Sequence, residues 1–171
     1  MKRTYSKTVV LSLAAFSLLL STCKDVSSAD SSVPVATVKK INGSATIVRQ
    51  GQPIPATNGL EIWENDTLRT GSNGSMGIVF NDDTFLSLGP GSVMTIDEFV
   101  FNPKQGKFSI VIRMLKGTAA YLSGLISKLS PESAHFNTPR ASIGIRGTKF
   151  VAKVEGDKKE ASRNQETWVD R

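Results

Sequence analysis

The sequence predicts one all-β domain of many short strands and hairpins with little helix. Along Lys107–Met114, Phe108, Ile110, Ile112 and Met114 alternate with their neighbours, and this period of two is typical of half-buried strands. Turn-forming residues recur at short intervals. The 171 residues suffice for one domain and little more. A sandwich, a roll and a short solenoid all fit this pattern.

The composition excludes several classes of protein. Apolar residues make up 39% of the chain and charged residues 21%, which argues against both a disordered chain and a membrane bundle. The formal net charge is +6, but four basic residues and one acidic residue lie in a segment predicted to be removed, which leaves 21 − 4 = 17 basic and 15 − 1 = 14 acidic residues, a net of +3. We therefore expect no nucleic-acid partner.

The N-terminal segment has the pattern of a secretory signal. Residues 1–7 carry three cations, and an apolar run from Thr8 to Leu20 follows, which is shorter than the roughly 20 residues of a membrane span. Cleavage after Ala29 would release a soluble exported protein, and processing at Cys23 would give a lipoprotein. An uncleaved anchor is the third alternative. A membrane contact is expected only through this signal or a lipid anchor.

Four regions follow from this pattern. Residues 1–29 are the predicted signal, residues 30–34 a linker, residues 35–155 the all-β domain, and residues 156–171 a polar tail that we expect to be disordered. Cys23 is the single cysteine, so no internal disulfide is expected.

The first part of the domain predicts strands joined by local turns. Asn42-Gly43 between apolar runs predicts a hairpin. Leu60 and Ile62 open another short strand. The polar segment Asn81–Thr84 predicts a tight turn between two apolar strands, because Asn and Asp bond their own backbone and tolerate left-handed dihedrals.

The second part predicts strands at residues 93–101 and 107–114 with a turn at 102–106. Residues 121–129 are ambiguous. Leucine and isoleucine recur there at helical spacing, but Gly124 weakens a helix and Pro131 ends one, so we predict either a single helical turn or a loop with buried leucines.

The last strand-like segment changes the parity of its apolar residues. Ile143 and Ile145 share one face, whereas Phe150 and Ala152 share a face of opposite parity. One extra residue would restore a common face, and we predict a β-bulge at Gly147 with a positive φ.

Two blocks of this sequence have a recognisable motif. The first block reads D-T-L-R-T-G at Asp66–Gly71 and L-G-P-G-S at Leu88–Ser92, and the second reads T-P-R-A-S-I-G-I-R-G-T-K-F at Thr138–Phe150. Together they resemble the FecR domain, the envelope domain named after regulators of ferric-citrate uptake, with Asp83 where that family usually has glycine. The resemblance covers about Gly43 to Val154. It implies a periplasmic protein-binding or signalling domain. No cytoplasmic segment is expected before the signal, so sigma-factor control is not carried over.

The residues give little support for catalysis, a metal or a cofactor. His135 is the single histidine, and no nucleophile-elbow pattern surrounds a serine. Asp82 and Asp83 lack the alternate spacing of a calcium loop. The Asp97-Glu98 pair points to opposite faces of a strand, which does not suit glycoside cleavage. We therefore expect no catalytic residue, no metal and no cofactor.

Two functions remain for the exported domain. The first is interaction with another envelope protein, for example by strand addition at an exposed edge, and the second is binding of cell-wall glycan by exposed aromatic rings. The candidate interaction residues from the two family blocks are Arg69, Thr70, Gly71, Arg146, Gly147 and Thr148. The candidate exposed aromatics are Trp63 and Tyr121, together with Phe85.

Overall fold

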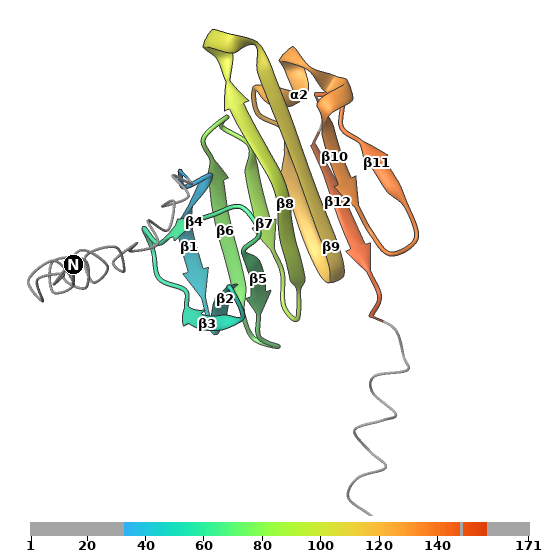
Figure 1. The fold of residues 1–171 in the computed structure, drawn as a ribbon. Coiled ribbons are helices and arrows are strands. Elements are labelled where there is room, and N and C mark those ends of the chain that lie inside the picture. The colour runs from blue at the N-terminus through green and yellow to red at the C-terminus, as the bar shows by residue number, and fades with distance from the viewer. Residues whose placement is uncertain (1–32, 148, 157–171) are drawn as a thin grey trace, which may run out of the picture. The chain divides into compact units, whose positions relative to one another are not determined.

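The computed structural model describes residues 33–147 and 149–156. The predicted signal with Cys23, the family-block residue Thr148 and residues 157–171 of the predicted tail lie outside them. The described residues form the predicted all-β domain, with little helix (Figure 1). Its strands are β1 (Ala36–Asn42), β2 (Ala45–Arg49), β3 (Gln52–Pro55), β4 (Glu61–Ile62), β5 (Thr67–Thr70), β6 (Ser75–Phe80), β7 (Phe85–Leu88), β8 (Val93–Asn102), β9 (Lys107–Leu122), β10 (Ala134–Asn137), β11 (Ser142–Gly144) and β12 (Lys149–Val154). Its helical turns are η1 (Pro103–Gln105), α2 (Ile126–Leu129) and η2 (Pro131–Ser133).

The strands form one curled sheet in the order β3-β2-β5-β8-β9-β7-β6-β1-β4. Neighbours are antiparallel, except that β10 runs parallel to β9. The long strand β9 joins the two halves of the sheet, because its first half pairs with β8 and β10 and its second half with β7 and β12. Of the architectures that fit the sequence, this is the roll.

The core lies on the concave face of the roll and draws side chains from both halves of the sheet. Val38 and Ile78 come from one half, and Ile47 and Leu68 from the other, and all four are fully buried in one cluster. Burial of this alternating set supplies the main driving force for the fold.

Consecutive strands cross from one half of the sheet to the other at connections that we call arches. The arches lie at residues 43–44 between β1 and β2, at 71–74 between β5 and β6, and at 89–92 between β7 and β8. The hairpin predicted at Asn42-Gly43 is therefore wrong, because β1 pairs with β4 and β6, whereas β2 pairs with β3 and β5. The apolar residues on both sides of this turn fold over the core instead of pairing with each other.

The arches stack on one another through backbone contacts. The Gly71 amide donates to the Ser44 carbonyl at 2.9 Å, and the Gly91 amide donates to the Gly71 carbonyl at 2.9 Å. A side chain at Gly74 would collide with the Ser44 carbonyl, and one at Gly43 would collide with the Asn73 carbonyl. The stack thus needs glycine at positions 43 and 74.

Strand β9 makes the same crossing without a break in the strand. It bends at Gly117, whose φ is +102°. A Cβ atom there would collide with the Cα atom of Ser92 in the preceding arch. Gly117 is therefore the residue at which the two halves of the sheet join.

Tight hairpins lie at the opposite end of the strands. The turn predicted at Asn81–Thr84 is confirmed, since β6 and β7 pair directly across it. The predicted single helical turn is also confirmed as α2. Only Ile126 of its apolar residues is buried, whereas Leu125 and Leu129 are exposed, so the alternative with buried leucines is wrong.

The bulge predicted at Gly147 is also wrong. Its φ of +59° is positive as expected, but Gly147 lies in the connection between two separate strands. Strand β11 pairs with β10, and β12 pairs with β9 in the other half of the sheet. Ile145 is consequently buried, whereas Ile143 on β11 is 39% exposed.

We expect Gly117→Ala to destabilise the domain much more than Gly106→Ala. Both glycines have a positive φ, but Gly106 has open space around its Cα atom. The loss in free energy of unfolding should be about 1 kcal/mol at Gly106 from backbone strain, and about 3 kcal/mol or more at Gly117, where strain and overpacking add. Urea denaturation measures both, and equal losses would contradict the crossing role of Gly117.

Candidate functional site

The R-T-G segment of the first block is part of the arch stack. The Thr70 hydroxyl donates to the Gly89 carbonyl at 2.6 Å and accepts from the Ser92 amide at 2.9 Å. A side chain at Gly71 would collide with the Ser44 side chain. Thr70 and Gly71 therefore stabilise the fold, and Arg69, which is exposed on β5, is the one residue of the three that is free to meet a partner.

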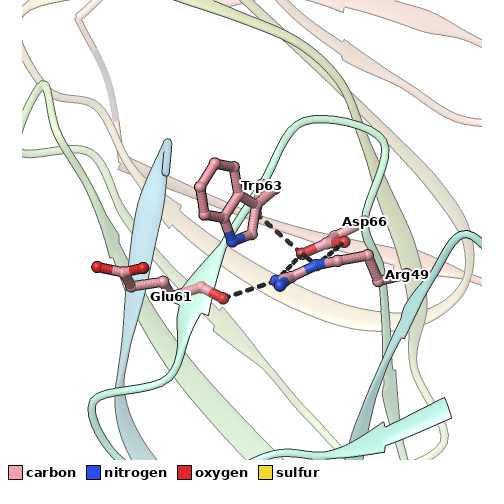
Figure 2. A network of polar contacts seen from close by, with 4 residues as sticks. All are labelled: Arg49, Glu61, Trp63 and Asp66. Carbon is pink, nitrogen blue, oxygen red and sulfur yellow. Dashed lines mark hydrogen bonds and ion pairs between the residues drawn. The ribbon is translucent and has the colours of Figure 1, made fainter. Parts of the chain in front are cut away.

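Asp66, at the start of the same block, anchors a polar network (Figure 2). The Arg49 guanidinium donates to both Asp66 carboxylate oxygens, with Nε–Oδ1 and Nη2–Oδ2 distances of 2.9 and 2.8 Å. The carboxylate also accepts from the Trp63 amide at 2.9 Å, and Arg49 donates to the Glu61 carbonyl at 2.8 Å. The hydrogen bond from Asp66 raises the pKa of Arg49.

This network ties three segments of the chain together. Asp66 is 1% exposed, and a buried carboxylate requires charged or polar partners, which Arg49 and the Trp63 amide supply. Arg49 joins β2 to the segment that links β4 and β5. The two-point contact explains why an acidic residue precedes β5.

Of the candidate exposed aromatics, one is buried and one is half-buried. Tyr121, one of the candidates, is 1% exposed and stacks on Phe150 with ring centroids 5.2 Å apart. Trp63 is half-buried, and the Arg49 guanidinium carbon lies 5.5 Å from its ring centroid. Phe85 is 37% exposed. Tyr121 is therefore excluded as an exposed ring, because its side chain lies in the core.

The acidic turn also has a structural role. The buried Asp82 carboxylate accepts from the Thr84 amide at 3.0 Å, from the Thr84 hydroxyl at 2.9 Å and from the Ile126 amide at 3.1 Å. It thereby attaches α2 to the β6–β7 hairpin. Asp83 has a φ of +65°, which explains glycine as the usual residue in the family block. Within residues 33–147 and 149–156, no three His, Cys, Asp or Glu side chains are grouped as metal ligands.

The R-G-T segment lies apart from the R-T-G segment. Arg146 and Gly147 are exposed in the connection between β11 and β12, and Thr148 is outside the described residues. Strands β8, β9 and β10 separate β5 from β11 in the sheet. The structure therefore does not bring the two arginine-containing segments into one site.

The side chains next to β12 are not used by the arches or by the Asp66 and Asp82 networks. A groove of about 440 Å³ opens between the β10–β11 hairpin and β12, with Leu115, Ile143 and Val154 among its lining residues. Two cations, Arg140 and Lys153, and one carboxylate, Glu155, also line it. We call β12 and this groove the C-terminal face. Figure 1 labels β12, together with the neighbouring β10 and β11, in orange to red at the end of the described chain.

The exposed cations of this face have no acidic partner among the described residues. Arg140, Lys149 and Lys153 of this face are exposed, as is Arg146 in the connection that leads to β12, and the ion pairs of the described chain are Arg49–Asp66 and Arg113–Asp97. The sequence reasoning missed Lys149 and Lys153. Lys149 and Lys153 alternate along the strand with the apolar Phe150 and Ala152. This alternation predicts that the two lysines point to the outward face of β12.

The family model described as FecR protein matches residues 66–164, which is more than half of the 171 residues. The match begins at Asp66 and includes both blocks and the C-terminal face. No curated protein matches the chain, and no solved structure matches it. None of the helices in the described part of the chain is long and apolar enough to cross a membrane.

We expect Gly147→Val to be more destabilising than Gly144→Val. A Cβ atom added at either glycine would have no other atom within 4 Å, but only Gly147 has a positive φ. Valine is strained at positive φ, which costs about 1–3 kcal/mol, whereas valine suits a strand such as β11. Urea denaturation compares the two variants, and a Gly144→Val loss as large as that of Gly147→Val would refute this explanation.

We expect Tyr121 to lower stability at alkaline pH. Burial raises its pKa from 10.0 to about 12, so the unfolded chain loses the phenolic proton first. The contribution of the buried neutral phenol to the free energy of unfolding is fully present below pH 10.0, and it is lost as the pH rises towards about 12.

The matched variant is Tyr121→Phe. The Tyr121 hydroxyl has no hydrogen-bond partner among the described residues, so at neutral pH the variant should unfold within about 1 kcal/mol of the natural chain. Above pH 10.0, the natural chain should lose stability faster than the variant. Parallel alkaline denaturation curves for the two proteins would contradict the burial of this phenol.

Proposed function

The chain belongs to the FecR family, and we propose that it acts in the cell envelope as a protein-binding signalling module without catalysis. The family match over residues 66–164 supports a regulatory role of the periplasmic type. The partner is proposed to be another envelope protein, because the resemblance offers a domain that relays signals by contact.

The observation that carries this proposal is the C-terminal face. It combines an exposed strand edge, a groove lined by both apolar and polar side chains, and cations that form no ion pair among the described residues. The first family block, by contrast, is used by the arches and by the Asp66 and Asp82 networks. A surface whose charged side chains contribute little to the fold is the better candidate for recognition.

The proposal that the protein is not an enzyme rests on its scarce reactive groups. His135 is the single histidine and is half-buried on β10. Cys23 is the single cysteine and lies in the predicted signal. No cofactor is proposed.

The proposed location is outside the inner membrane. The basic head and apolar run of residues 1–20 support export. Cleavage after Ala29 would leave a soluble periplasmic protein, and lipidation at Cys23 would leave a lipoprotein. The mass of the mature N-terminus distinguishes these two products.

We expect photo-crosslinking in intact cells to trap a discrete protein partner. A photoreactive phenylalanine analogue would replace one exposed residue at a time, at Arg69 on β5, at Lys104 in η1 and at Val151 on β12. Export is checked by fractionation of the same cells. A defined crosslinked protein at any one of these positions, identified by mass spectrometry, is the expected result.

Glycan binding is the alternative function, and its test gives the result that would contradict the proposal. Co-sedimentation of the purified protein with isolated peptidoglycan, together with no protein adduct at any position, would refute the protein-binding proposal. Binding to isolated glycan is not expected, because Tyr121 is buried and the Arg49 guanidinium lies over the Trp63 ring.

A further inference from the structure

Among the described residues, the roll has four edge strands. β3 and β4, the two termini of the strand order, lie together at what we call the first end of the roll, and β11 and β12, which are attached through β9 and β10, lie at the last end (Figure 1). At the first end, β4 has two residues, and β3 carries Pro53 and Pro55, which have no amide hydrogen. At the last end, β11 has three residues, whereas β12 has six and contains no proline. Strand β12 is therefore the most suitable edge for pairing with another chain.

Within the described residues, β12 pairs on one side only, with β9. Its inward side chains Phe150, Ala152 and Val154 are half-buried, and its outward side chains include Val151, which is 66% exposed. An unpaired edge of this kind presents a row of backbone donors and acceptors to a partner strand.

The groove next to this edge can accept an apolar side chain. Leu115 is 43% exposed and Ile143 is 39% exposed, and both line the groove of about 440 Å³. Peptides that add to a sheet obtain affinity from backbone hydrogen bonds and specificity from such side-chain pockets.

The charge of the face identifies the chemistry of the occupant. Residues 138–156 contain four cations and one carboxylate, Glu155, a net of 4 − 1 = +3. The 15 residues from 157 to 171 contain four acidic and four basic residues, a net of zero, so they complement this face poorly. An acidic segment from another protein fits it better.

The same charges disfavour a second copy of this chain. Two-fold antiparallel pairing of β12 about Val151 would place Lys149 of one copy opposite Lys153 of the other. Like charges directly opposite each other in a sheet are destabilising, and lysines on an edge strand oppose self-association.

We propose that the C-terminal face binds an extended acidic segment of an envelope protein, which pairs with β12 and places an apolar side chain in the groove. This inference rests on the proposed function and specifies its site. The crosslinking experiment separates the two: an adduct at Arg69 or Lys104 without one at Val151 would leave the protein-binding function standing and refute this site.

The direct test uses the purified exported chain and a labelled seven-residue peptide that alternates glutamate with valine and leucine. Two control peptides carry lysine in place of glutamate, or methyl groups on alternate backbone nitrogens that block strand pairing. We expect the acidic peptide to bind and both controls to fail. Equal binding of the methylated peptide would refute strand addition.

A matched pair of charge-reversed variants locates the site. Lys149→Glu with Lys153→Glu should weaken peptide binding by about tenfold or more. Lys104→Glu with Lys107→Glu changes two exposed lysines at the β8–β9 hairpin and should leave the affinity within about twofold. Equal weakening in both double variants would show a nonspecific charge effect and refute the site.

Hydrogen exchange of the full chain reports which edge is used. The peptide should slow exchange of the β12 amides and leave β3 unchanged. If the amides on both edges of β12 were protected before the peptide is added, residues 157–171 or a second copy of the chain would already occupy the free edge. Sedimentation would distinguish these two explanations, and either one would refute the proposal. Binding to vesicles of anionic phospholipid without peptide binding would also refute it.

Discussion

The fold depends on the close backbone contact between arches that carry the chain across the core. Each crossing must bring two strands over the same set of buried side chains, so successive arches lie against one another with little room for Cβ atoms. Gly117 carries the most demanding form of this constraint, because β9 stays hydrogen-bonded on both sides of its bend. The bend is the step that makes one sheet out of two sets of strands.

Polar groups at the arches must then be satisfied inside the protein, since buried amides and carbonyls without partners are costly. Thr70 and Ser92 supply these partners. The Ser92 hydroxyl lies 2.8 Å from the Gly89 carbonyl and accepts from the Thr118 amide at 3.1 Å. These contacts explain, without a ligand, why the first block has threonine at Thr70 and serine at Ser92.

The sequence pattern predicted what depends on neighbouring residues and missed what depends on distant ones. The alternation in β9, the turn at Asn81–Thr84 and the positive φ of Gly147 are local and are confirmed. Period two does not identify the strand that lies alongside, so Asn42-Gly43 was assigned to a hairpin instead of an arch. The burial of Tyr121 and the basic row on β12 likewise depend on which face of β9 and β12 meets the core.

The arrangement also explains why recognition would be concentrated at one end of the roll. A rolled sheet that does not close has two ends, and unpaired edges invite association unless they are blocked. Prolines and a two-residue strand limit pairing at the first end. At the last end, lysines on β12 oppose pairing between copies but attract carboxylates. The same side chains that keep the protein from assembling with itself thus select an acidic partner.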